Sequence, residues 1–315
     1  MKVTLLFPGQ GAQYVGMGNN LKETEFYNYF KKADEILKYS ISDIAANGPD
    51  DQLKLTENTQ PAIVTHSVAL FEKLKPILAK KNIEIAQVLG HSVGEYAALV
   101  AAGVLKFEDA VKAVHLRGKY MQEAVPVGQG KMIAILKLDG DIVKEACRKA
   151  STADSQVMPA NFNDPKQIVI SGHAEACDQA VKWLEENVKE RFGAIPLQVS
   201  APFHSALMKP AAEKMTAVLS DIKFEANTIP YIANIDAKKY NAGTDADKIR
   251  SNLIDQICGS VLWTQSIQEL GTTTKFIEVG PGKVLSGLMK RILPDAQVLT
   301  LDTPESFDKL EEFLS

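Results

Sequence analysis

The order of apolar segments along residues 1–125 predicts strands and helices in alternation. Short, almost continuously apolar stretches at residues 3–7 and 85–89 predict buried strands. Apolar residues at helical spacing predict helices around residues 25–37, 61–78, 95–102 and 108–123. Such alternation is typical of an α/β fold with a mainly parallel sheet.

The pattern changes at Pro126, Gly128 and Gly130, which are residues typical of turns. Six elements are then predicted in the order strand, helix, strand, strand, helix, strand: residues 131–138, 141–150, 156–161, 167–171, 174–189 and 194–199. This order is the split βαβ unit of a ferredoxin-like fold.

Beyond residue 200 the alternating pattern resumes. It predicts helices at residues 206–219, 246–257, 261–270 and 284–292, and strands at 229–233, 275–279 and 297–301. We therefore expect an α/β, hydrolase-like large lobe with a mainly parallel sheet, formed by residues 1–127 and 200–315. A small ferredoxin-like α+β lobe, residues 128–199, is inserted into it. The cleft between two lobes is a common place for a substrate site.

Composition excludes several classes of function. Of the 315 residues, 45% are hydrophobic and 23% are charged, as in globular proteins, and the net charge of −4 predicts no nucleic-acid or membrane partner. Three cysteines far apart predict neither a disulfide framework nor a metal site. The first residues are too short for a signal sequence, and the longest apolar run, residues 97–105, cannot span a bilayer. We therefore expect a cytoplasmic protein.

The segment Gly90-His91-Ser92-Val93-Gly94 joins the strand predicted at 85–89 to the helix predicted at 95–102. A strand, a G-x-S-x-G turn and a helix together form a nucleophile elbow. The glycines allow a sharp turn, so the Ser92 hydroxyl would project at the helix N-terminus, where backbone N–H groups stabilise an oxyanion. The alternative is an exposed serine in an ordinary turn.

A serine becomes a good nucleophile when a base takes its proton, and the chain has five histidines. His204 is the strongest candidate, because it lies in the segment APFHS (201–205), where a strand ends at the return to the large lobe. His91 lies inside the elbow, where we expect its side chain to point away from the Ser92 hydroxyl. No acidic residue stands out to orient His204. A backbone carbonyl could hold its Nδ1–H instead, and the sequence leaves this open.

Two further features could complete such a site. The glycine turn at residues 7–13 fails as a dinucleotide-binding fingerprint, because Tyr14 occupies the third glycine position. The turn could instead bring the N–H of Gln10 toward that of Val93 to form an oxyanion hole, or it could be only a tight connection. Arg117, on the helix predicted at 108–123, could pair with a carboxylate or lie at the surface.

Together these residues resemble the malonyl-CoA:acyl-carrier-protein transacylases of bacterial fatty acid synthesis. The segments that carry the resemblance span nearly the whole chain in the family's order. They are residues 7–13 (FPGQGAQ), 59–62 (TQPA), 90–96 (GHSVGEY), 117–118 (RG), 161–163 (NFN), 201–205 (APFHS) and 278–282 (EVGPG).

The resemblance implies a ping-pong acyl transfer without a cofactor. His204 would deprotonate Ser92, which would take the malonyl group from malonyl-CoA and release coenzyme A. The phosphopantetheine thiol of holo acyl carrier protein would then take the malonyl group from the serine. The oxyanion would lie between the N–H groups of Gln10 and Val93, and Arg117 would pair with the malonyl carboxylate.

The resemblance also implies how the base is oriented and what lines the site. A backbone carbonyl near a glutamine, by alignment Gln256, would hold the histidine, which would explain the missing acid. Asn161 and Asn163 resemble residues that line the site from the small lobe, and we also expect His91 among the substrate-binding residues. As a separate hypothesis, we expect Phe203, next to the base, to fill the space of an α-methyl group and disfavour methylmalonyl-CoA.

An acidic carrier protein would need a basic surface near the site. The helix predicted at 284–292 and the residue directly before it carry three basic side chains: Lys283, Lys290 and Arg291. They could form a basic patch, or only an ordinary solvated face.

Two other functions compete with acyl transfer at this point. A plain serine hydrolase uses the same elbow and base, but it needs no arginine for the acyl group. A module that binds nucleotide or phosphate could use the glycine turns, although their fingerprints fail.

Overall fold

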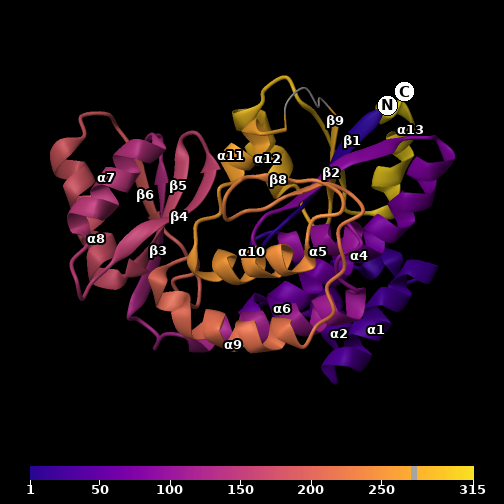
Figure 1. Cartoon of the computed structure of the whole chain (residues 1–315), viewed down its shortest axis with the longest axis horizontal. Helices are drawn as coiled ribbons and strands as arrows, with labels where there is room; N and C mark the ends of the chain where they lie inside the picture. The colour runs from indigo at the N-terminus through magenta and orange to yellow at the C-terminus, as the bar shows by residue number, and fades with distance from the viewer. Residues whose placement is uncertain (271–274) are drawn as a thin grey trace.

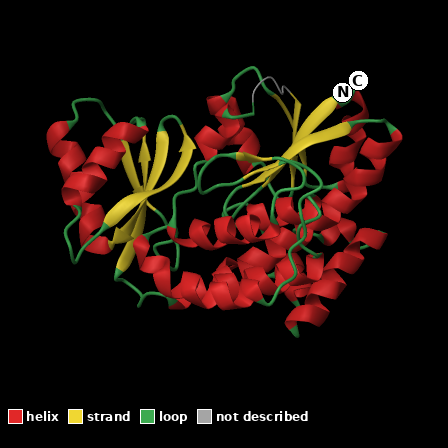
Figure 2. Ribbon diagram, in the orientation of Figure 1, coloured by secondary structure: helices red, strands yellow, loops and turns green. Residues whose placement is uncertain are grey.

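The computed structural model describes residues 1–270 and 275–315, and these form two lobes, each around its own sheet (Figure 1). The large lobe contains both the N-terminal and the C-terminal parts of the chain, and the small lobe is formed by the middle part. Figure 2 shows the two sheets side by side, with helices packed along the large one.

The large lobe is built on a six-stranded sheet with the order β10-β9-β1-β2-β7-β8. All neighbouring strands run parallel except β7 and β8. The mainly parallel sheet confirms the predicted α/β class. The strands are β1 (Lys2–Phe7), β2 (Glu84–Gly90), β7 (Tyr231–Ile232), β8 (Lys239–Tyr240), β9 (Lys275–Val279) and β10 (Gln297–Leu301).

Helices pack on both faces of this sheet, because alternate residues of β1 point to opposite sides. The helices are α1 (Asn28–Leu37), α2 (Ile41–Asn47), α3 (Asp50–Lys54), α4 (Thr56–Lys80), α5 (Gly94–Ala101), α6 (Phe107–Glu123), α9 (Lys209–Ser220), α10 (Ala246–Cys258), α11 (Trp263–Gln268), α12 (Val284–Ile292) and α13 (Leu310–Phe313), with 3-10 turns η1 (Asn19–Leu21), η2 (Glu25–Tyr27), η3 (Ala206–Met208) and η4 (Pro304–Lys309). Across residues 1–270 and 275–315, none of the helices has the length and apolarity needed to cross a membrane.

Several helices differ from those predicted. The helix predicted from residue 61 begins at Thr56, because four of the five polar residues at 56–60, all but Glu57, are buried against the rest of the lobe. The helix predicted at 261–270 is shortened to α11, because Val261 forms a β-bridge with Asn161. The two short helices α2 and α3 were not predicted.

The small lobe is an antiparallel four-stranded sheet with the order β4-β5-β3-β6, which confirms the predicted ferredoxin-like topology. Helices α7 and α8 cover the face away from the large lobe (Figure 1). The element bounds run from residue 130 to residue 196, and the lobe limits at 128 and 199 stay a prediction. The elements are β3 (Gly130–Leu136), α7 (Gly140–Ala150), β4 (Val157–Asp164), β5 (Gln167–His173), α8 (Ala174–Asn187) and β6 (Gly193–Pro196).

The two lobes are joined by specific polar contacts. Val261 donates its N–H to the carbonyl of Ala160 at the bridge between the lobes. Arg291 Nε of α12 donates to Asp164 Oδ2 of β4 at 2.5 Å, and the Asp164 side chain is buried. Arg291 pairs with the small lobe but remains exposed, as do Lys290 and Lys283, the N-cap residue of α12, so the basic patch stays a prediction.

Candidate active site

The turn between β2 and α5 has the strained geometry of a nucleophile elbow. Ser92 has a φ of 51°, in the left-handed region that residues with side chains rarely adopt. A Cβ on Gly90 would lie 2.0 Å from the carbonyl carbon of Gly94, and a Cβ on Gly94 would lie 2.2 Å from the carbonyl oxygen of Phe7. The two glycines of the motif are therefore required by the close approach of backbone on both sides.

His204 lies against the serine from the loop between β6 and η3. Its Nε2 is 2.7 Å from Ser92 Oγ, and its Nδ1 is 2.9 Å from the backbone carbonyl oxygen of Gln256 on α10. Because a carbonyl only accepts, Nδ1 carries the proton and Nε2 is free to accept the serine proton. The orientation that the sequence left open is thus provided by a backbone carbonyl. Burial, and then the charge of Arg117, lower the pKa of His204 to about 3, so the ring is neutral at physiological pH.

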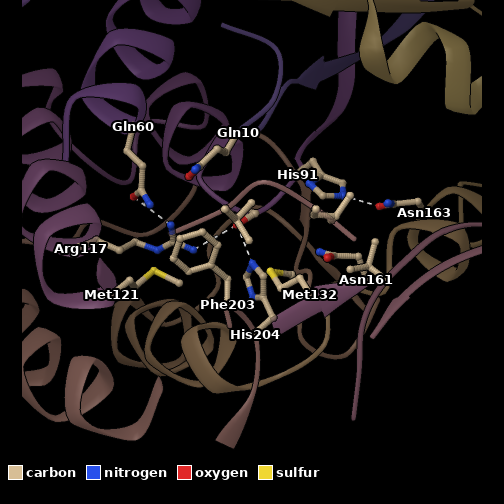
Figure 3. Close-up of a pocket in the computed structure, with 14 residues that line it drawn as sticks. Gln10, Gln60, His91, Arg117, Met121, Met132, Asn161, Asn163, Phe203 and His204 are labelled. Atoms are coloured by element: carbon tan, nitrogen blue, oxygen red, sulfur yellow. Dashed lines mark hydrogen bonds between the residues drawn. The ribbon is translucent and has the colours of Figure 1, made fainter. Parts of the chain in front are cut away.

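Arg117 is buried on α6, and Figure 3 shows its side chain extending toward the cavity beside Gln60 and Phe203. Nη1 donates to Gln60 Oε1 at 2.9 Å, and Nη2 donates to Gln256 Oε1 at 2.9 Å and to Ser92 Oγ at 3.2 Å. Nε is buried and has no hydrogen-bond partner among the residues described. In the described part of the chain, no carboxylate forms an ion pair with this guanidinium. A buried cation in this state favours an anionic ligand, since an unpaired buried charge is costly.

The backbone donors predicted for an oxyanion lie on two adjoining turns. His91 donates its N–H to the carbonyl of Phe7 at 2.9 Å, which brings the glycine turn that follows β1 against the elbow. Ser92 N–H is already used, since it donates to Asn234 Oδ1 at 2.7 Å. Val93, next along the chain, is the N-cap residue of α5, and Gln10 lines the cavity at the serine. The N–H groups of Gln10 and Val93 therefore stay our predicted oxyanion donors.

A cavity of about 150 Å³ lies over the serine between the two lobes. Eight of the ten residues predicted for the site line it, and Val93 and Gln256 do not. The lining residues are Gln10, Gln60, His91, Ser92, Arg117, Met121, Phe203 and His204 from the large lobe, Met132, Asn161, Asn163 and Val169 from the small lobe, and Leu197 and Val199 from the segment that follows β6.

His91 connects the elbow to the small lobe. Its Nε2 donates to Asn163 Oδ1 at 2.8 Å, and its ring packs on Trp263 with 5.5 Å between the ring centroids. Burial lowers the pKa of His91, so this side chain is neutral. Its hydrogen bond is therefore made to the small lobe and not to Ser92 Oγ.

Three buried polar residues of this region were given no role from the sequence. Gln60 and Glu95 lie in segments that carry the family resemblance. Each is a polar residue within a buried helix, and that is the sequence signal that could have indicated a role in the site. Asn234 follows the two-residue strand β7 and gives no local signal at all. It donates Nδ2–H to the carbonyl of Gly90 at 2.7 Å, so it joins both sides of the elbow.

Comparisons with known proteins agree with this geometry. The family model of the acyl transferase domain matches residues 4–300. A malonyl CoA-acyl carrier protein transacylase of Bacillus subtilis is 43% identical over 312 residues, which cover 98% of this chain and 95% of that protein. The crystal structure of an acyl carrier protein S-malonyltransferase from Vibrio cholerae has a TM-score of 0.91 and 40% identity, covering 98% of this chain and 100% of that one. A malonyl-transacylase in complex with a type II polyketide synthase acyl-carrier protein has a TM-score of 0.90 and 36% identity, covering 99% of each chain.

Proposed function

This chain belongs to the acyl transferase family, and on that premise we propose that it moves a malonyl group from malonyl-CoA to the phosphopantetheine thiol of holo acyl carrier protein. One observation carries the proposal: the 2.7 Å contact between Ser92 Oγ and His204 Nε2 lies beside the buried guanidinium of Arg117. The malonyl group and the carrier protein are named by the relatives of this chain.

In the first half of the reaction, Ser92 takes the malonyl group. Its Oγ attacks the thioester carbonyl carbon while His204 Nε2 accepts the hydroxyl proton. The carbonyl oxygen becomes an oxyanion held by the N–H groups of Gln10 and Val93. The carbon–sulfur bond then breaks, and the imidazolium returns its proton to the sulfur of coenzyme A. The Gln256 carbonyl keeps the Nδ1 proton in place throughout.

The second half repeats these steps with the carrier protein. His204 accepts the proton of the phosphopantetheine thiol, the sulfur attacks the malonyl-serine ester, and Ser92 leaves with the proton restored. Each proton accepted by the imidazole is returned to a leaving group of the same half-reaction. The residues of this chain and the two thiols therefore suffice, and no cofactor takes part in the proposal.

Arg117 selects the acyl group that the serine accepts. Its guanidinium is oriented by Gln60 and Gln256, and it lies within 3.2 Å of Ser92 Oγ. An acyl group with a free carboxylate can satisfy this charge in the cavity, whereas an acetyl group cannot. Phe203 lines the same cavity and would occupy the space of an α-methyl substituent.

We also place the protein in the cytoplasm, where its three free cysteines would stay reduced. Acyl transfer differs from hydrolysis in the fate of the acyl group. Labelled malonyl-CoA should leave label on the protein, and holo carrier protein should then remove that label into itself. Release of free malonate at the same rate with and without carrier protein would indicate a hydrolase and contradict the proposal.

A further inference from the structure

Gln256 is hydrogen-bonded to the proposed catalytic residues and their neighbours through three groups: its backbone carbonyl and the two ends of its side-chain amide. The backbone carbonyl accepts from His204 Nδ1, and Oε1 accepts from Arg117 Nη2. Nε2 donates to Glu95 Oε2 at 2.7 Å and to the carbonyl of Ser92 at 3.1 Å. The amide is fully buried, so water does not compete for these contacts.

The orientation of this amide decides what faces the guanidinium of Arg117. With Oε1 toward Arg117, an acceptor meets a donor at 2.9 Å. After a half turn of the amide, the NH2 group would face the guanidinium, and two donors would meet without an acceptor. The guanidinium would then lose one of the two side-chain carbonyls that orient it, leaving only that of Gln60.

Glu95 is the group best placed to fix this orientation. It is buried on the first turn of α5, and its Oε2 also accepts from the backbone N–H of Asn234 at 3.1 Å. Oε2 is an acceptor, so it favours the NH2 end of the Gln256 amide over its oxygen at this position. Burial raises the pKa of Glu95 to about 8, and Oε2 can accept in either protonation state, because a carboxylic acid retains a carbonyl oxygen.

We propose that Glu95 is a positioning residue that sets the acyl-group preference of the site by holding Gln256 with its Oε1 toward Arg117. Glu95 does not line the cavity, so it acts through Gln256 and touches no substrate. The inference rests on the proposed function, in which Arg117 receives the malonyl carboxylate.

Removing the acceptor of Glu95 should therefore affect malonyl transfer more than acetyl transfer. Without Oε2 the Gln256 amide loses the shortest of its three Nε2 contacts and keeps only the longer ones, to the Ser92 carbonyl at 3.1 Å and to Asn234 Oδ1 at 3.4 Å. The amide is then held less firmly, and the guanidinium loses part of the alignment needed to bind a carboxylate through two parallel hydrogen bonds. An acetyl group has no carboxylate and does not depend on that alignment. The backbone carbonyl of Gln256 belongs to α10 and continues to hold His204, so the shared chemistry is retained.

The test compares Glu95→Met, which removes the acceptor at similar length, with Glu95→Gln, which keeps one. The measurement is kcat/KM for loading of the protein by malonyl-CoA and by acetyl-CoA. We expect the malonyl-to-acetyl ratio to fall on the order of ten-fold in Glu95→Met and to stay within about three-fold of wild type in Glu95→Gln. Equal losses for both acyl groups, or equal ratios in the two variants, would overturn the proposal.

A second pair of variants tests the path through Gln256. Gln256→Met should lower the ratio as Glu95→Met does, and adding Glu95→Met to it should lower the ratio no further. An unchanged malonyl-to-acetyl ratio in Gln256→Met would refute the proposal, and this ratio can be measured even if Glu95→Met does not fold. Multiplicative effects of the two substitutions in the double variant would refute it as well. Malonyl loading by the wild-type protein tests the proposed function separately, and it stands whichever result Glu95 gives.

Discussion

Replacement of Arg117 by alanine is expected to reverse the acyl preference of this protein. Arg117 is 1% exposed, its guanidinium makes three side-chain hydrogen bonds, and no carboxylate forms an ion pair with it among the residues that the structure describes. A malonyl carboxylate bound in Arg117→Ala would be buried without its partner, whereas the acetyl group would lose no charge interaction.

The magnitude follows from the burial. Truncating one member of a buried, hydrogen-bonded charge pair costs about 2–5 kcal/mol. At 1.36 kcal/mol for each factor of ten, kcat/KM for malonyl loading should fall by about 30-fold to several thousand-fold. Complete burial and two orienting carbonyls place the expected loss in the upper part of this range. The value for acetyl-CoA should change far less.

The assay is single-turnover release of coenzyme A from each thioester, recorded with the same preparation of protein. Arg117→Lys is the matched control, because lysine keeps the charge but cannot bind a carboxylate through a fork, and its loss should be intermediate. Thermal unfolding of each variant shows whether the fold is retained. Equal losses with malonyl-CoA and acetyl-CoA would refute the reasoning, since Arg117 would then act on the serine and not on the acyl group.

Four further predictions concern Phe203, His204 and Gly118. Phe203→Ser should raise methylmalonyl loading relative to malonyl loading by about ten-fold, and an unchanged ratio would contradict the role of Phe203. Because the pKa of His204 is lowered to about 3, the malonyl loading rate should show no protonation step near pH 6.5, the ordinary value for histidine. For the same reason, between pH 3 and 6.5 the unfolded chain binds more protons at His204 than the folded chain does. The contribution of His204 to the free energy of unfolding is therefore complete above pH 6.5 and declines as the pH falls toward 3. Urea titrations across this range measure that decline, and no change in the free energy of unfolding would contradict a ring buried in the neutral form. In Gly118→Ala a Cβ would lie 2.5 Å from the backbone carbonyl of Thr56, so α4 and α6 must separate, and the free energy of unfolding should fall by about 1–3 kcal/mol, measured by the same titration.

The parts of the fold that could be predicted from the sequence are those fixed by local patterns. The strands β1 and β2 are short apolar segments, and the elbow between β2 and α5 is signalled by two glycines that the close backbone packing requires. The order of elements in the small lobe was enough to give its ferredoxin-like topology.

The features that could not be predicted depend on contacts between distant segments. The helix expected from residue 261 is shortened by a bridge to Asn161, which lies 100 positions earlier in the chain. Asn234 contacts Ser92 across 142 positions, and Glu95 contacts Gln256 across 161. Such partners carry no local pattern, because a buried amide or carboxyl is recognised only when its hydrogen-bond partners are known.

The candidate site shows both situations. The elbow and the loop of His204 were identified from local segments, and the structure brings their side chains to 2.7 Å. The group that orients His204 was left open from the residues alone, since a backbone carbonyl has no sequence signature. The roles assigned to Gln10 and Val93 stay predictions that variants of the elbow must test.

The central claim is that Ser92 carries the malonyl group with His204 as its base. The most direct test is mass spectrometry of the protein mixed with malonyl-CoA, followed by peptide mapping of the adduct in wild type, Ser92→Ala and His204→Ala. One malonyl group should be found on the Ser92 peptide of the wild-type protein, none in Ser92→Ala, and a slowly formed trace in His204→Ala. An adduct that persists in Ser92→Ala, or that maps to another residue in the wild type, would contradict the account.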